Sequence, residues 1–275
     1  GMIYDNPSPN YVVNMQQGVL DGVRGSGLEL VVHPCNRGAD SFLADVQGFV
    51  VRQKLFGVVL PPSVSEDDRV IAILKAADCP YVRIASVSLD EPANMVVTND
   101  SRGAAEAARH LAEQGHRRVA FISGPTTFRS SHERGRGFRE GLAEHGVTLD
   151  EAYVRQGAYT FESGVEAAES LLAMPSPPTA IFAGNDEMAI GVMKAARDKG
   201  LDVPGDLSIV GFDDLPMASR VWPNLTTVRL PIRDMGRMAA EKLTARSRGL
   251  DPATLSQPEV IPSLVVRQST AGPRG

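Results

Sequence analysis

Residues that bind metals or form disulfides are scarce in this sequence. Only two of its 275 residues are cysteines, Cys35 and Cys79, and no CxxC or mixed Cys/His spacing suited to zinc occurs. We expect both to be buried free thiols, and we expect no metal and no cofactor. The five histidines show no ligand spacing, and His116 is expected in a solvated turn before a strand.

Catalytic and membrane signals are absent as well. The sequence has no Gly-x-Ser-x-Gly elbow, no Walker loop and no His-Glu-x-x-His motif, which argues against an enzyme. No apolar run approaches the roughly 18 residues that a membrane helix requires. The first residues also lack the pattern of a secretory signal. We therefore expect no membrane partner.

Basic residues are outnumbered by acidic ones. The 28 Lys+Arg and 33 Asp+Glu give a formal net charge of -5, whereas a bare nucleic-acid-binding module is normally basic. With 43% hydrophobic residues, the chain has the composition of a globular protein. Its length allows one large domain or two moderate ones.

Short apolar runs alternate with amphipathic helical patterns along the chain. The clearest runs, nearly free of charge as buried parallel strands are, cover 58–60, 119–122, 179–182 and 208–212. Helical spacing of apolar residues lies between them, as in Ala104, Ala107, Ala108 and Leu111. This alternation predicts an α/β fold of right-handed βαβ units, and about ten or eleven strand candidates favour two lobes over one sheet.

Three glycines, Gly135, Gly137 and Gly141, form a GxGxxxG motif inside a helical stretch. The spacing differs from the GxGxxG of dinucleotide-binding loops. Close helix packing is therefore the favoured interpretation.

Polar residues follow several of the predicted strands. In open α/β sheets, ligands bind beyond the carboxyl ends of the strands. The candidates at such positions are Asp5, Arg134, Tyr159, Asn185 and Asp213. Carboxylates accept hydrogen bonds, a guanidinium donates them and an amide does both, while an aromatic face covers a ring. This set suits a polyhydroxylated ligand such as a sugar.

Each candidate also has a structural alternative. Asn185 could cap the helix that follows it, and Asp213 or Asp214 could cap the next turn. Arg134 could form a surface ion pair, and Tyr159 could belong to the core. Their convergence on one edge of the sheets is what favours a binding site.

Motifs along essentially the whole chain resemble the lactose/galactose-repressor (LacI/GalR) family of transcriptional regulators. Two of them read NDSRGA and FAGNDEMAIG. In order, the motifs cover 99–104, 110–111, 115–125, 134–138, 182–191, 210–214, 223–228, 235–236 and 264–270.

The resemblance implies two doubly wound parallel-sheet lobes with a type I periplasmic-binding-protein-like fold. The N-lobe would hold residues 1–98 plus 231–259, and the C-lobe 99–230 plus 260–275. The DNA-binding helix-turn-helix of the family has no counterpart in this chain. The resemblance therefore implies the regulatory fragment of a cytoplasmic homodimeric repressor, which reaches operator DNA only through that missing domain.

In the family, a small effector lies between the lobes. Arg134, Asn185 and Asp213 match its effector-binding residues, Tyr159 matches its ring-stacking aromatic, and Tyr11 matches an aromatic of the N-lobe wall.

Two departures concern the N-lobe half of that pocket. Ala85 stands where the family usually has an aspartate, and Leu230 stands where a glutamine is common. We therefore expect a less polar N-lobe half and an effector that is a sugar or a glycoside with an apolar aglycone.

The sequence favours the effector-sensing and dimerisation domain of a LacI-type regulator. The alternative is a solute-binding receptor of an ABC sugar transporter with the same fold. The 115–125 run and the 225–236 segment are more typical of repressors than of receptors.

Overall fold

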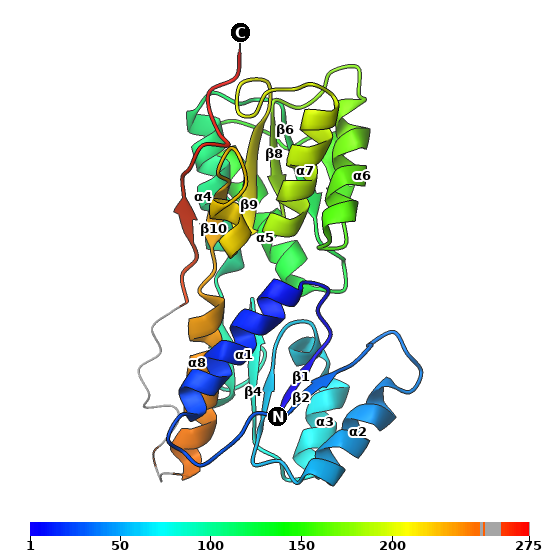
Figure 1. Ribbon diagram of the computed structural model, residues 1–275, viewed down its shortest axis with the longest axis vertical. Helices are drawn as coiled ribbons and strands as arrows, with labels where there is room; N and C mark the ends of the chain where they lie inside the picture. Colours follow the sequence, from blue (N-terminus) through cyan, green and yellow to red (C-terminus); the bar gives the residue numbers. More distant parts are fainter. Residues whose placement is uncertain (248–249, 251–259, 275) are drawn as a thin grey trace. The chain divides into compact units, whose positions relative to one another are not determined.

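The computed structural model describes residues 1–247, 250 and 260–274 (Figure 1). They form two compact units. Unit 1 comprises Gly1–Thr98 and Pro231–Val260, and unit 2 comprises Asn99–Leu230 and Ile261–Gly275. Val260, grouped above with the C-lobe, forms a parallel bridge with Thr98 of unit 1. The predicted lobe limits at 259 and 275 lie outside the described residues.

Unit 1 is built on a five-stranded parallel sheet in the order β2-β1-β3-β4-β5. Its strands are β1 (Met2–Tyr4), β2 (Val32–Pro34), β3 (Val58–Leu60), β4 (Tyr81–Ala85) and β5 (Met95–Val97). Its helices are α1 (Pro9–Val23), α2 (Phe42–Gln53), α3 (Asp68–Ala76) and α8 (Ile232–Ser247). Helix α1 packs on α8 and α2 on α3 (Figure 1). Ile3, Val58 and Leu60 point from one face of the sheet into the core beneath α2 and α3.

Unit 2 is built on a six-stranded sheet in the order β11-β10-β9-β8-β6-β7. Its strands are β6 (Val119–Ser123), β7 (Val154–Gln156), β8 (Ala180–Ala183), β9 (Ser208–Asp213), β10 (Thr226–Arg229) and β11 (Ser263–Val265). Its helices are α4 (Asp100–Glu113), α5 (Arg129–Ala143), α6 (Phe161–Leu172) and α7 (Asp186–Asp198). Only β11 runs antiparallel among these strands. The predicted α/β class with two parallel sheets is thus confirmed, with β11 as the exception.

A row of phenylalanines fills the face of this sheet that α4 and α5 cover. Phe121, Phe182 and Phe212 come from three neighbouring strands, and Phe138 comes from α5. Neighbouring ring centroids lie 4.8–6.5 Å apart, the range in which aromatic pairs attract. All four side chains are buried. The row therefore forms an aromatic core between this sheet and α5.

Two expectations about single residues need correction. His116 is only 1% exposed. Both of its ring nitrogens have partners, since Nδ1 lies 2.9 Å from the Thr179 hydroxyl and Nε2 lies 2.8 Å from the Ala271 carbonyl. It therefore links the C-terminal segment at Ala271 to Thr179, which precedes β8, and does not lie in a solvated turn. Both cysteines are free, but Cys35 is only partly buried. Among the described helices, none is long and apolar enough to cross a membrane.

Glycines bring neighbouring helices into backbone contact in three pairs. Between α4 and α5, a Cβ on Gly137 would lie 1.9 Å from the Ser101 carbonyl oxygen, and one on Gly141 would lie 2.5 Å from that of Ala105. Gly18 of α1 approaches α8 in the same way, and Gly191 of α7 approaches α6. The helix-packing interpretation of the GxGxxxG motif is therefore confirmed.

Gly137→Ala should destabilise the chain, because its methyl group would overlap backbone atoms that cannot rotate away. We expect a loss of about 3 kcal/mol in the free energy of unfolding, the upper part of the range for overpacked interiors. Gly48→Ala on α2 is the matched control, since its Cβ would meet only the flexible guanidinium of Arg52. That variant should gain about 0.5–1 kcal/mol from helix propensity. Urea unfolding measures both, and equal stabilities would contradict the packing argument.

Candidate functional site

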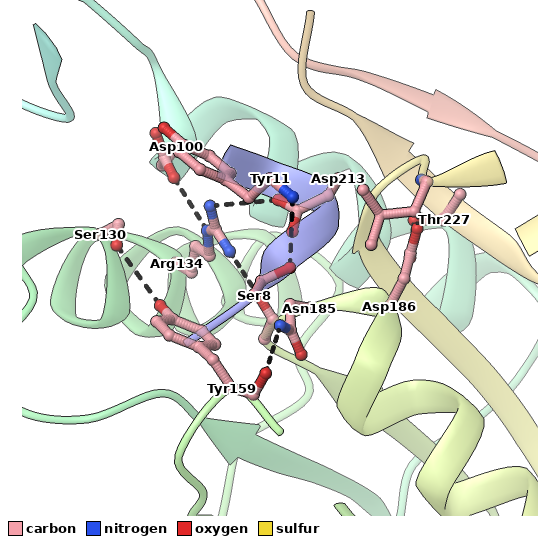
Figure 2. A network of polar contacts seen from close by, with 12 residues as sticks. Ser8, Tyr11, Asp100, Ser130, Arg134, Tyr159, Asn185, Asp186, Asp213 and Thr227 are labelled. Carbon is pink, nitrogen blue, oxygen red and sulfur yellow. Dashed lines mark hydrogen bonds and ion pairs between the residues drawn. The ribbon is translucent and has the colours of Figure 1, made fainter. Parts of the chain in front are cut away.

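A cluster of buried polar residues lies at the carboxyl edge of the unit 2 sheet (Figure 2). We call it the Arg134 cluster. Each side chain is at most 6% exposed, and the members are Asp100, Arg134, Tyr159, Asn185 and Asp213. The structure thus brings together four of the six sequence-predicted site residues within one unit, because strands β9, β8, β6 and β7 follow one another in the sheet and run parallel.

Arg134, in the first turns of α5, is the centre of the cluster. Its Nε donates to Asp100 Oδ2 at 2.8 Å, and its Nη1 donates to the Gly184 carbonyl. Its Nη2 lies 3.6 Å from Asp213 Oδ1, and its guanidinium carbon lies 3.8 Å from the centre of the Phe212 ring. The surface ion-pair alternative is therefore wrong, since the guanidinium is only 5% exposed.

Asp100 is the residue of the cluster that sequence reasoning missed. It is the first residue of α4 and only 1% exposed. A carboxylate is favourable at a helix N-terminus, where the helix dipole is positive. Its place in the NDSRGA motif, directly before a helical pattern, is the signal that could have found it. It neutralises the buried guanidinium at close range.

Tyr159 follows β7 and has a positive φ of 62°. Its hydroxyl lies 2.8 Å from the Ser131 hydroxyl and 3.3 Å from that of Ser130. Its ring lies so close to the backbone of Gly124 that a Cβ there would be 2.0 Å from a ring atom. The side chain is therefore packed within unit 2, as the core alternative predicts. Its role as a stacking aromatic stays a prediction.

Asn185 caps helix α7, as the structural alternative predicts. Its Oδ1 accepts the Met188 backbone N–H at 3.0 Å, and its Nδ2 donates to the Tyr159 carbonyl at 3.0 Å. A side-chain amide has two N–H donors, and the second has no partner among the described residues. Capping therefore leaves one N–H of the amide unpaired among the described residues.

Asp213 ends β9 with a positive φ of 111° and is 5% exposed. Its Oδ1 has no hydrogen-bond partner among the described residues. The next residue differs, since Asp214 accepts from Arg229 Nε at 2.7 Å and from Arg267. A buried acceptor without a donor is costly, so Asp213 is the acceptor of this edge that a ligand hydroxyl would satisfy.

Burial raises the pKa of Asp213 to about 7. The positive charge of Arg134 opposes this change, whereas the negative charges of Asp100 and Glu187 add to it. With Asp100 already bound to the guanidinium, an ionised Asp213 leaves the cluster with an excess negative charge. This electrostatic balance favours ligands that donate hydrogen bonds and disfavours anions.

The two remaining predicted residues lie in unit 1. Asp5 follows β1 and accepts the Arg37 backbone N–H at 3.0 Å. Tyr11 is 6% exposed and lies on α1. Their part in the same site stays a prediction.

The edge of β4 carries a polar group that sequence reasoning missed. Ala85, the departure noted above, is fully buried. The next residue, Ser86, is 7% exposed, and its hydroxyl has no hydrogen-bond partner among the described residues. Within the part of the chain that the structure describes, no group of three His, Cys, Asp or Glu side chains could hold a metal ion.

The raised pKa of Asp213 predicts a pH dependence of stability. The folded chain keeps this proton up to about pH 7, whereas the unfolded chain loses it near 3.8. The folded state therefore binds more protons in this window, and the free energy of unfolding falls as the pH rises through it. In Asp213→Asn, the free energy of unfolding should therefore fall less steeply with rising pH, by up to about 1.4 kcal/mol per pH unit.

Urea unfolding of both proteins at several pH values between about 4 and 8 measures the difference. Asp150→Asn is the control, because Asp150 is an exposed carboxylate of the same unit whose capping bond an amide also makes. If the free energies of unfolding of the wild type and Asp213→Asn differed by the same amount at every pH in this window, the raised pKa of Asp213 would be contradicted.

Comparisons with known proteins place this chain in a family. The family model described as periplasmic binding protein-like domain matches residues 108–270. The chain is 36% identical over 187 residues to the probable HTH-type transcriptional repressor ExuR of Bacillus subtilis. That match covers 68% of this chain, which spans only 56% of the repressor's length.

Two solved structures have the same fold. One is the complex of the transcriptional regulator CelR with cellobiose, with a TM-score of 0.86 at 29% identity, covering 98% of this chain and 83% of that one. The other is a LacI family transcriptional regulator from Mycobacterium smegmatis, with a TM-score of 0.82 at 27% identity over 100% of both chains. The chain therefore belongs to the LacI family of transcriptional regulators and carries its periplasmic binding protein-like domain.

Proposed function

We propose that this chain is the effector-sensing part of a transcriptional repressor and that the Arg134 cluster binds hydroxyl groups of a sugar or glycoside. The observation that carries the proposal is the buried Asp213 carboxylate, whose Oδ1 has no hydrogen-bond partner among the described residues. A ligand hydroxyl would supply the missing donor.

The relatives support a regulatory role over the receptor alternative. The similar proteins reported above are regulators, and the CelR structure is described as a cellobiose complex. We accordingly propose a cytoplasmic protein without catalytic activity. The name of the ExuR repressor includes a helix-turn-helix, and we propose that operator DNA is bound by such a domain and not by this acidic chain.

The charges of the cluster select the kind of effector. The positive charge of the Arg134 guanidinium is already balanced by Asp100, so the cluster has no spare positive charge to neutralise an anion. A neutral hydroxyl could donate to Asp213 and accept from the second N–H of Asn185. Hydrogen bonds to charged groups contribute about 1.5–3 kcal/mol each. Two or three such bonds to one effector would therefore give an affinity that calorimetry can measure.

Asp213→Ala should weaken effector binding without destabilising the ligand-free chain. Losing a buried charged hydrogen bond costs about 2–5 kcal/mol, or roughly 30-fold to several thousandfold in Kd. The probes are cellobiose and a panel of neutral sugars and glycosides, with inorganic phosphate as the anionic comparison. Calorimetry measures affinity, and thermal unfolding measures the melting temperature.

Asp150→Asn is again the control, and its affinity should equal that of the wild type. An unchanged affinity in Asp213→Ala with a lowered melting temperature would mean that Asp213 is structural. Tighter binding of phosphate than of every neutral probe would contradict the charge argument.

We also propose that the chain forms a homodimer, as regulators of this kind pair their DNA-binding heads on palindromic sites. Light scattering at micromolar concentration should give about twice the single-chain mass of 29.4 kDa. Trp222, the only tryptophan of the chain, is 85% exposed. Its emission therefore reports whether a second copy covers that surface. A mass of 29.4 kDa at all concentrations would contradict the dimer.

A further inference from the structure

Asp186 is a buried carboxylate that the proposed effector site does not use. It is the first residue of α7, and none of its surface is exposed. Its Oδ1 accepts from the hydroxyl of Thr227 on β10 (Figure 2), and its Oδ2 accepts the Leu215 backbone N–H at 2.7 Å. Both oxygens bind the protein itself, which indicates a role within the fold.

The bond to Leu215 closes the turn that carries Asp213. Asp213 and Asp214 have φ angles of +111° and +55°, a region that residues other than glycine seldom adopt. Asp214 is held by two arginines, and Leu215 is held by Asp186. The unusual backbone at Asp213 therefore depends on anchors that follow it directly in the chain.

A glycine in β9 leaves the space that Asp186 occupies. A Cβ on Gly211 would lie 2.3 Å from Asp186 Oδ1, which is too short for a non-bonded contact between carbon and oxygen. Glycine weakens the interior of a strand and often marks a place where another group approaches closely. Gly211 is thus an independent sign that this position is built to receive the carboxylate.

We propose that Asp186 is the positioning residue of the effector site: its carboxylate holds the turn through Leu215 and thereby aims the carboxylate of Asp213. The role of Asp213 as an effector contact rests on the proposed function. The dependence of Asp213 on Asp186 does not, and it can be tested without any effector.

The two carboxylates also interact electrostatically. Burial, followed by the negative charge of Asp213, raises the pKa of Asp186 well above its usual value of 3.8. The other charged groups that face the pair are Asp100 of α4, Arg134 of α5, Glu187 of α7 and Asp214 of the turn. Because only one of these is a cation, we expect Asp186 and Asp213 to titrate as a coupled pair.

The test compares Asp186→Ala with Asp186→Asn in the ligand-free chain. Asparagine keeps an oxygen for the Leu215 N–H but carries no charge, whereas alanine removes both. Hydrogen exchange of the Leu215 amide and the pH titration of the Asp213 carboxyl carbon are measured by NMR. Thr227→Val is the matched control, because it removes the other bond to Asp186 and leaves the bond to Leu215.

In Asp186→Ala we expect the Leu215 amide to exchange at least about tenfold faster, as for the loss of a hydrogen bond to a charged group. Asp186→Asn should restore slow exchange and reduce the coupled titration of Asp213 to a single step. Thr227→Val should retain slow exchange and the coupled titration. If the alanine variant does not fold, the Asp213 titrations of Asp186→Asn and Thr227→Val decide whether the proposal holds.

Unchanged Leu215 exchange in Asp186→Ala, or an unchanged Asp213 titration in Asp186→Asn, would overturn the proposal. A wild-type chain that binds no sugar would count against the proposed function alone, because neither NMR signal depends on an effector.

Discussion

The buried ion pair between Arg134 and Asp100 is the interaction on which the site of unit 2 depends. A guanidinium in the interior requires a carboxylate partner, since removing one member of such a pair leaves an uncompensated charge. Here Asp100 comes from the first turn of α4 and Arg134 from α5, two helices that glycines bring into backbone contact. The packing of the helices therefore sets the position of the charge.

The ion pair also explains why Asp213 keeps an unsatisfied oxygen. Arg134 uses its Nε on Asp100 and its Nη1 on Gly184, while Phe212 covers one face of the guanidinium. Asp213 is left 3.6 Å away, close enough for attraction but beyond a hydrogen bond. Asp213 Oδ1 is thus a buried acceptor without a donor among the described residues, and under the proposed function a ligand hydroxyl would supply that donor.

Local pattern was enough to predict much of this structure. Buried parallel strands have nearly uncharged apolar sequences, so the runs at 179–182 and 208–212 were recognisable, and the polar residues after them marked the edge where Asn185 and Asp213 lie. The GxGxxxG spacing likewise predicted close helix packing, which the contact of Gly137 with Ser101 confirms.

Contacts between distant parts of the chain escaped prediction. The partner of Arg134 is 34 residues away, and the partners of His116 are 63 and 155 residues away. No periodicity encodes such pairings, because they arise only when the sheet is assembled. Asn185 shows the same limit, since the sequence allowed both a cap and a ligand contact, and only the structure shows that capping still leaves one donor.

The most direct test of this account observes the Asp213 carboxyl carbon and the Arg134 Nε–H by NMR while a sugar or glycoside that calorimetry shows to bind is added. We predict that the Asp213 signal shifts with occupancy of the site, that the Arg134 signal remains that of a group bonded to Asp100, and that the Asp150 carboxyl carbon does not move. An Asp213 signal that stays in place at saturation would contradict the assignment of the Arg134 cluster as the effector site.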